Sequence, residues 1–230
     1  MKCWWAFLVL LLAGCHTTSV VSPGAIDSDQ LEDSLHTWME QAAQEGSSTD
    51  LYFNLGHAYY ARGEAASAVA FWRASHILTP RDGDVSHNLA LARTDLKGAA
   101  TPVEPLAPWT ELLTPDELGM AGLLVVLVGF GLVRARRRPI GAVLILLGLL
   151  LGLRAGQIRA QEYGQPIAVV VADATYLREA PRLEARRIGS VETGTELRSI
   201  ERQDAFVLVR GGEGLRGWIP RERLQIVRLR

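Results

Sequence analysis

Cysteine is nearly absent from this 230-residue chain, because Cys3 and Cys15 are the only two and both lie in the first 15 residues. If the chain is cleaved before Cys15 and this thiol is modified, the mature protein has no free thiol. Disulfides, thiol catalysis and cysteine metal sites are then excluded.

The chain also lacks an excess of charge of either sign, since 24 Lys and Arg residues oppose 25 Asp and Glu residues. This balance argues against a nucleic-acid-binding protein. The two ends nevertheless differ. Residues 16–114 carry 5 basic and 13 acidic side chains, whereas residues 164–230 carry 12 arginines and 9 acidic side chains. The stretch between them is almost entirely apolar apart from an arginine cluster, which indicates a multidomain chain built around a membrane.

Catalytic motifs are missing as well. No spacing typical of metal ligands is present among the five histidines, His16, His36, His57, His76 and His87. The glycine-rich segment 211–214 lacks the Lys and the following helix of a phosphate-binding loop, and no nucleophile elbow is present. The sequence therefore predicts a protein that is not an enzyme and that uses no metal or cofactor.

The N-terminus has the layout of a secretory signal: one lysine, about ten apolar residues, and small residues at a cleavage point. Residues 12–15, Leu-Ala-Gly-Cys, resemble a bacterial lipobox. The resemblance implies a signal peptide over residues 1–14, lipidation of Cys15 and a tether over residues 15–26. The alternative is an uncleaved anchor with an incidental Cys15. Both interpretations place the following residues on the outer face of the membrane.

A proline-rich stretch over residues 99–115 predicts a semi-rigid linker, and a helical hairpin over residues 116–156 follows it. The hairpin has two uncharged runs, 118–133 and 139–153, each about 22–24 Å long as a helix. Because a hydrocarbon core is roughly 30 Å thick, snorkelling arginines or local thinning of the bilayer must cover the remaining distance. By the positive-inside rule, the turn 134–138 lies in the cytoplasm, because it contains Arg134, Arg136, Arg137 and Arg138.

Two other interpretations of the hairpin stay open: a buried core hairpin of a soluble protein, and a re-entrant membrane loop. Either membrane geometry returns the chain to the side that it left, so the segments before and after it share a compartment. The N-terminal signal identifies that compartment as the periplasm, and the membrane as a bacterial inner membrane. Gly148 and Gly152 have the spacing of small residues at close helix contacts, although glycine is also simply common in membrane helices.

Residues 27–98 contain an internal repeat with an offset of 34 residues: Asn54 recurs as Asn88, and Trp72 maps back onto Trp38. The central copy resembles a tetratricopeptide repeat, a pair of antiparallel helices that stacks into an α-solenoid. The resemblance rests on Tyr52, Leu55, Gly56, Tyr59, Ala68, Trp72 and Pro80. Between the two helices, Arg62-Gly63 predicts a helix-ending turn.

In the repeat family the inner helix face binds peptides, and the resemblance places Phe53, His57 and Tyr60 on that face. Alternatively, Phe53 and Tyr60 pack against the neighbouring half-repeat, and for His57 we favour a simple surface position. Repeats of this kind usually need about three copies to bury a continuous core. Because only one full unit is present between two half-repeats, we expect it to be marginally stable alone and to lean on a partner, on the membrane or on itself.

From residue 164 onward, short β-branched runs separated by turn residues predict a small all-β barrel of five strands over residues 164–230. Tyr176–Arg178 and Gly217–Pro220 resemble motifs of a bacterial SH3 (SH3b) domain. The resemblance implies that Trp218 fills the barrel core and that Gly217 lets the strand pass close to it. An aromatic residue that this family often has before the fourth strand is missing. The many arginines have three open roles: contact with anionic lipid, contact with the acidic repeat, or a solvated surface.

The order of lipobox, repeat, hairpin and SH3b domain resembles the BatE family of bacterial aerotolerance (Bat) systems. The resemblance implies a non-enzymatic inner-membrane adaptor that presents both soluble modules to the periplasm. It also implies membrane lipid, membrane proteins with von Willebrand factor A domains and a MoxR-type AAA+ ATPase as partners. The alternative is a cell-wall sensor that binds peptidoglycan or peptide through its SH3b domain. No nucleic-acid partner is expected.

Overall fold

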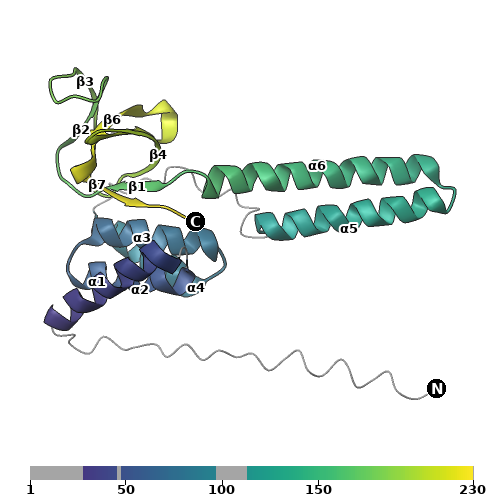
Figure 1. The fold of residues 1–230 in the computed structure, drawn as a ribbon, viewed down its shortest axis with the longest axis horizontal. Helices are drawn as coiled ribbons and strands as arrows, with labels where there is room; N and C mark the ends of the chain where they lie inside the picture. The colour runs from purple at the N-terminus through teal and green to yellow at the C-terminus, as the bar shows by residue number, and fades with distance from the viewer. Residues whose placement is uncertain (1–27, 46–47, 97–112, 230) are drawn as a thin grey trace, which may run out of the picture.

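The computed structural model describes residues 28–45, 48–96 and 113–229 (Figure 1). The predicted signal peptide, Cys15 and most of the proline-rich linker lie outside the described residues. The described chain forms a cluster of four helices, a long two-helix hairpin and an antiparallel β domain. Figure 1 shows the helical cluster and the β domain together at one end of the hairpin.

The helical cluster consists of α1 (Ser28–Glu45), α2 (Thr49–Ala61), α3 (Ala65–Leu78) and α4 (Gly83–Asp95). Helices α2 and α4 have 13 residues each, and α4 begins 34 positions after α2, which agrees with the offset of the sequence repeat. At the end of α2, Gly63 adopts a φ of +80° and its amide donates to the Tyr60 carbonyl at 2.9 Å. The amide of Glu64 donates to the Tyr59 carbonyl, which completes a left-handed helix cap. The predicted turn at Arg62-Gly63 is therefore confirmed.

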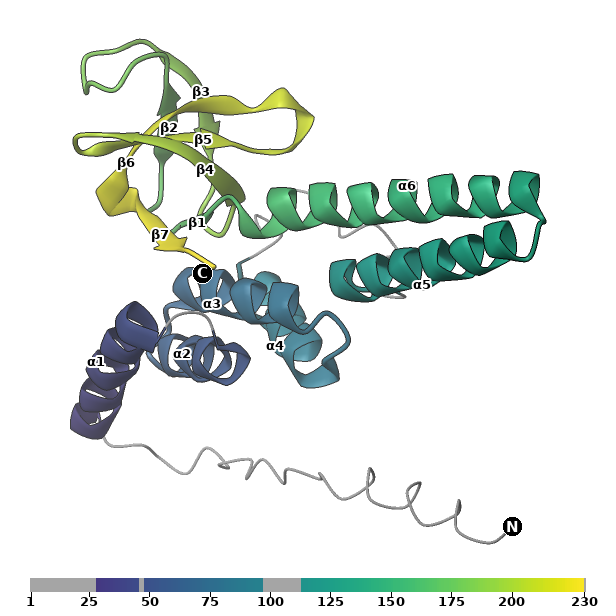
Figure 2. The same ribbon diagram turned by 45° about the vertical axis from the view of Figure 1, so that its right-hand side comes forward.

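Helix α3 lies between the other helices of the cluster and the β domain, and nearly all of its side chains are buried. Helices α2 and α4 cover one side of it, and strands β1 (Ile167–Val170) and β7 (Leu224–Val227) cover the other (Figure 2). Ile167, Val169 and Val227 belong to the same apolar core as the helices. A helix that is apolar all round needs cover on every side. The helical repeat is thus supported by the β domain of the same chain.

The hairpin consists of α5 (Pro115–Arg134) and α6 (Arg138–Tyr163). With 20 and 26 residues they extend about 30 and 39 Å, and both are long and apolar enough to cross a membrane. They exceed the predicted runs because Thr114 and Glu117 form a capping box before α5, and because α6 continues through a polar segment. Met120 and Phe130 are more than 60% exposed, whereas a core hairpin of a soluble protein would bury such side chains.

Glycines spaced seven residues apart bring the two hairpin helices into contact. A Cβ atom on Gly122 would lie 2.8 Å from the Gly148 carbonyl oxygen, and one on Gly129 would lie 2.8 Å from the Gly141 carbonyl oxygen. At Gly152 nothing lies within 4 Å of such an atom. Gly148 therefore belongs to the helix contact, as one interpretation proposed. The crowded glycines of each helix lie seven residues apart, a spacing typical of left-handed helix packing.

The β domain contains seven antiparallel strands, two more than predicted. Between β1 and β7 the chain forms β2 (Thr175–Arg178), β3 (Arg187–Val191), β4 (Glu196–Gln203), β5 (Phe206–Arg210) and β6 (Arg216–Pro220), with short 3₁₀ turns at Gly212–Gly214 and Arg221–Arg223. The strand order is β3-β2-β6-β5-β4-β1-β7. Within the described residues β3 and β7 are the two ends of this ladder, so the predicted small all-β domain is present but its sheet is not a closed barrel.

Trp218 is half-buried and lies outside the core of the β domain, which corrects the prediction that it fills that core. Successive side chains of a strand point to opposite faces. The neighbouring Ile219 is fully buried and fills the core in place of Trp218. Gly217 does permit a close approach, but to a different neighbour: a Cβ atom there would lie 3.0 Å from the Leu177 side chain.

Candidate functional site

Helix α2 carries three aromatic side chains on one face, Phe53, His57 and Tyr60, and we call this group the aromatic patch. Their spacing of four and three residues places them on the same side of the helix. The Phe53 and His57 rings meet edge to face with centroids 4.5 Å apart. Phe53 and Tyr60 are half-buried, while His57 is exposed. The predicted partner-binding residues therefore form one surface, and packing within the protein accounts for only part of their area.

The floor of the aromatic patch is Trp72 of α3, which is 1% exposed. Its ring centroid lies 5.3 Å from that of His57 and 5.4 Å from that of Tyr60. The indole nitrogen donates to the Phe53 carbonyl at 3.1 Å. The ring packs directly on Gly56, where any side chain would clash with it. The small residue and the large one thus position the patch together.

The other residues predicted to build the repeat lie in or next to its core. Leu55 and Ala68 are fully buried, Tyr52 is 3% exposed, and Pro80 lies in the turn after α3. The Tyr59 ring stacks on Phe71 with centroids 5.1 Å apart. Ser75 of α3 is fully buried, and its hydroxyl donates to the Thr49 carbonyl at 3.1 Å. That hydrogen bond removes the cost of burying the hydroxyl.

Two polar side chains of α4 border the aromatic patch. The amide nitrogen of Asn88 lies 3.3 Å from His57 Nε2, and the Tyr60 hydroxyl donates to an Asp95 carboxylate oxygen at 2.5 Å. This hydrogen bond raises the pKa of Tyr60, because the carboxylate favours the protonated phenol. Neighbouring rings shield the His57 imidazole from water, and this desolvation lowers its pKa. At neutral pH the patch therefore carries one negative charge at its border and no positive charge of its own.

A buried ion pair joins the helices to the β domain, and sequence reasoning missed it. Glu196 of β4 is 2% exposed and accepts a hydrogen bond from Arg93 Nε at 2.9 Å. Arg73 Nε of α3 lies 3.4 Å from the second carboxylate oxygen. One expectation was that arginines of the β domain contact the acidic repeat. This ion pair has the reverse arrangement, because its arginines come from the helices and its acid comes from the β domain. One signal was available: Arg73 is the single arginine in a mostly apolar helix.

One further ion pair joins the hairpin to the helical cluster, and a second ion pair joins the two hairpin helices to each other. Arg81, in the turn before α4, donates to Glu117 at the start of α5 at 2.9 Å. Asp116 pairs with Arg159 near the end of α6. The Tyr163 hydroxyl donates to the Ile77 carbonyl of α3 at 3.2 Å. The base of the hairpin is therefore held against the helical cluster by polar contacts on both of its helices.

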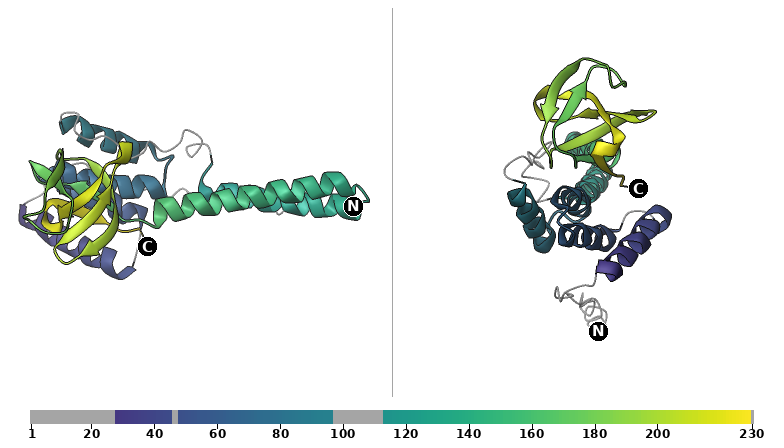
Figure 3. Two further views of the ribbon diagram at one scale, coloured as in Figure 1. Left: turned by 90° about the horizontal axis from the view of Figure 1, so that it is seen from above. Right: turned by 90° about the vertical axis from the view of Figure 1, so that its left-hand side faces the viewer.

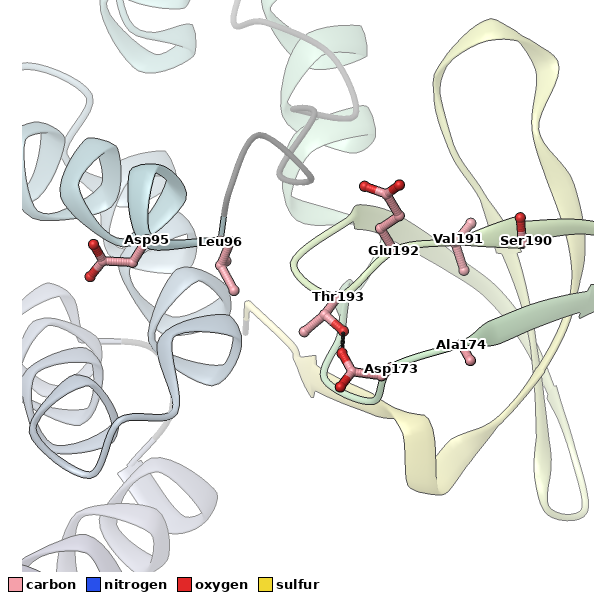
Figure 4. Close-up of a pocket in the computed structure, with 8 residues that line it drawn as sticks. All are labelled: Asp95, Leu96, Asp173, Ala174, Ser190, Val191, Glu192 and Thr193. Atoms are coloured by element: carbon pink, nitrogen blue, oxygen red, sulfur yellow. Dashed lines mark hydrogen bonds between the residues drawn. The ribbon is translucent and has the colours of Figure 1, made fainter.

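A cleft of about 480 Å³ lies between the end of α4 and the turns of the β domain. Its acidic side chains do not converge, as Figure 4 shows. The Asp95 carboxylate points away from the strands, Glu192 points out of the cleft, and Asp173 accepts a hydrogen bond from the Thr193 hydroxyl at 2.6 Å. Among the described residues no group of three or more His, Cys, Asp or Glu side chains is arranged to hold a metal ion. The aromatic patch is thus the better candidate for binding.

Residues 173–225, which form these turns and strands, match the family model of the bacterial SH3 domain. This segment is a bacterial SH3 domain. The match covers β2 to β6 and the start of β7, so β1, which packs against α3, lies outside it. No curated protein and no solved structure matches the chain.

The end of the SH3 domain farthest from α3 exposes a mixed apolar and basic surface. Strand β3 ends the ladder, with Ile188 50% exposed and Leu183, in the preceding loop, 60% exposed. The Arg187 guanidinium lies 4.2 Å from the centroid of the half-buried Tyr176 ring. Figure 1 shows β3 pointing away from the hairpin. This surface, and not the buried β1 and β7 side, is available to a ligand of the SH3 domain.

Proposed function

We propose that this protein is a non-enzymatic adaptor of a bacterial inner membrane that presents its helical repeat and SH3 domain to the periplasm as one unit. One observation carries the proposal: both modules share the core around α3 and the buried Glu196 ion pair, while the aromatic patch lies on α2, on the opposite side of α3 from the SH3 domain (Figure 2). A shared core keeps two binding surfaces at a fixed position relative to each other, which is what a scaffold requires.

The hairpin supports the membrane part of this proposal. Its apolar side chains are exposed along both helices, and Arg134, Arg136, Arg137 and Arg138 are all exposed in and next to the turn. That turn lies at the end away from the soluble modules (Figure 3). Lipid covers the apolar surface and the arginine turn stays in the cytoplasm. Bacterial SH3 domains are often extracellular or periplasmic, in accord with this orientation.

The helical cluster functions as a short tetratricopeptide array in this proposal. The support is the 34-residue distance between α2 and α4 and the packing of Gly56, Ala68 and Trp72. The order of the segments further suggests a Bat-type complex with von Willebrand factor A-domain membrane proteins and a MoxR-type ATPase. Lipidation of Cys15 would add an acyl anchor to the one that the hairpin supplies.

Single-cysteine labelling tests the orientation, because Cys3 and Cys15 are the only native cysteines. With Cys3 and Cys15 both replaced by serine, we expect a membrane-impermeant maleimide to label Leu183→Cys in intact spheroplasts. Arg136→Cys should be labelled only after permeabilisation. Labelling of Arg136→Cys in intact spheroplasts, or protection of Leu183→Cys, would contradict the proposed topology.

Photo-crosslinking from position 53 in living cells then tests for protein partners, and a cross-linked protein with a von Willebrand factor A domain would support the Bat-type complex.

A cell-wall sensor is the second candidate, and the exposed surface around β3 favours it, since bacterial SH3 domains bind peptidoglycan or peptides in many proteins. We expect such a sensor to be retained on purified sacculi as the detergent-solubilised full-length chain. The full chain is needed because β1 and β7 are covered by α3. Leu183→Asp with Ile188→Asp should abolish retention if this surface binds the cell wall. Failure of the unmodified protein to bind sacculi would leave the adaptor as the function.

A further inference from the structure

We infer that the aromatic patch and Asp95 together bind a cationic side chain, lysine or arginine, of an extended peptide segment in a partner protein. This inference rests on the proposed adaptor function, since it specifies the chemistry of the partner. The binding surface is defined by Phe53, His57 and Tyr60 on α2 and by Asn88 and Asp95 on α4.

The aromatic rings supply the first part of the recognition. The face of an aromatic ring attracts a cation, and lysine and arginine also lay their methylene chains along apolar surface. Tyr60 packs on Trp72 and Phe53 packs on His57, and because both are half-buried, part of each ring stays accessible. Leu91 on α4 is 41% exposed and offers an apolar contact to a residue beside the cation.

Asp95 supplies the charge. Its carboxylate is exposed and accepts one hydrogen bond from the Tyr60 hydroxyl, while a carboxylate has about four lone-pair sites in all. Among the described residues no ion pair joins Asp95 to a basic side chain. Its carboxylate also points away from the SH3 domain, toward the helices (Figure 4). A guanidinium or ammonium group from a partner is therefore free to complete this site.

The charges around the aromatic patch favour a cation over an anion. Residues 16–114 contain 13 acidic and only 5 basic side chains. Four of the basic ones are already paired: Arg62 with Glu32 and Glu64, Arg73 and Arg93 with Glu196, and Arg81 with Glu117. The fifth, Lys97, lies outside the described residues. His57 has a lowered pKa and is neutral at physiological pH, so it does not repel a cation.

Peptide binding to the full-length protein in zwitterionic nanodiscs tests this inference. The probes are fluorescein-labelled Gly/Ser peptides that differ only in three evenly spaced residues: lysine, norleucine or glutamate. We expect the lysine peptide to bind at least about tenfold more tightly than the other two, and to weaken as salt is added. Empty nanodiscs measure the contribution of lipid. Equal binding of the three peptides, or no binding of the lysine peptide at about 1 mM, would overturn the inference.

Matched variants then assign the effect to the proposed residues. Asp95→Asn should weaken binding of the lysine peptide at least about fivefold. Asp33→Asn, the same change on the exposed face of α1, should change the affinity less than about twofold. Tyr60→Phe keeps the ring and should retain binding, while Tyr60→Leu should lose it. Equal losses for Asp95→Asn and Asp33→Asn would overturn the inference.

Thermal unfolding of each variant separates lost binding from lost fold. If Asp95→Asn unfolds at a lower temperature than the unmodified protein, the Tyr60→Phe and Tyr60→Leu variants still show whether binding depends on the aromatic ring or on the hydroxyl. The failure of this inference is also distinguishable from the failure of the adaptor function. A partner that cross-links to position 53 in cells, combined with no preference for lysine peptides in vitro, would retain the adaptor and exclude the cationic ligand.

Discussion

Glu196 and Arg93 form an ion pair although 103 positions separate them in the chain. The Arg73 guanidinium contacts the same carboxylate from α3, so one acid of the SH3 domain faces two arginines of the helical cluster. Because Glu196 is 2% exposed, water screens this arrangement little. The contact makes the docking of the SH3 domain on α3 specific, since an apolar surface alone does not select one orientation.

Replacement of Glu196 by alanine should destabilise the protein strongly. The variant removes the buried carboxylate that Arg73 and Arg93 both contact, and breaking a buried pair in this way costs about 3–5 kcal/mol. Chemical unfolding of the detergent-solubilised full chain measures the change. The matched control is Glu201→Ala, an exposed acid on the same strand, which should change stability by less than about 0.5 kcal/mol. Equal effects of the two substitutions would show that the buried pair contributes nothing specific.

A charge placed on β7 should loosen the helical cluster. Val227 is 4% exposed and belongs to the core that α3 shares, so Val227→Asp buries a carboxylate at a cost of about 3 kcal/mol or more. Hydrogen exchange of the α3 amides should then become faster. Arg228→Asp, at an exposed neighbouring position, is the control and should leave the exchange of α3 unchanged. Unaltered protection of α3 in Val227→Asp would mean that the helices are stable without the SH3 domain.

A single methyl group should separate the hairpin helices. Gly122→Ala places a Cβ atom 2.8 Å from the Gly148 carbonyl oxygen, and such overpacking costs about 1–3 kcal/mol. Gly131→Ala and Gly152→Ala add the same methyl group where nothing lies within 4 Å. Disulfide formation between cysteines introduced on α5 and α6 reports the helix separation, and we expect it to slow in Gly122→Ala alone. Similar rates in all three variants would argue against close glycine packing.

The stability should fall as the pH is lowered from about 6.5 to about 4, because His76 has a pKa of about 4 in the folded protein and 6.5 as its ordinary value. Burial is the main cause, and Arg73 and Arg93 add to it. Between these pH values only the unfolded chain takes up the proton, so protonation favours unfolding. We expect a loss of about 1–2 kcal/mol, since solvent reduces the effect on a partly exposed ring.

Denaturant titrations at pH 7.5 and pH 4.5 measure this loss. His76→Gln should reduce the pH dependence, whereas His36→Gln, on an exposed face of α1, should preserve it. A His76→Gln variant with the full pH dependence would assign the loss to other groups. His57 also has a lowered pKa and accounts for a part that persists in His76→Gln.

Local features of the fold were predictable from the sequence because neighbours in the chain determine them. Gly63 adopts the left-handed conformation that ends α2, and the arginine turn separates α5 from α6 where the apolar runs stop. The place of Trp218 was not predictable in this way. Alternation along β6 requires that either Trp218 or Ile219 point inward, and only the position of the sheet decides which one.

The aromatic patch was predictable as a set of residues but not as a site. The repeat pattern identified Phe53, His57 and Tyr60, while the contact of Asp95 with Tyr60 depends on how α4 packs beside α2. The pairing of Glu196 with Arg73 and Arg93 had no sequence signal beyond one arginine in an apolar helix.

The sequence by itself determined the segments of this protein: a 34-residue helical repeat, two apolar helices around an arginine turn, and a run of short strands. Periodicity, glycine turns and charge patterns act over a few residues, so each segment records its own structure. Only the tertiary structure decided that α3 would be covered by β1 and β7, that Glu196 would be buried between two arginines, and that the aromatic patch would stay open. These outcomes depend on shape and charge complementarity between surfaces that are distant in the chain, which no local pattern encodes.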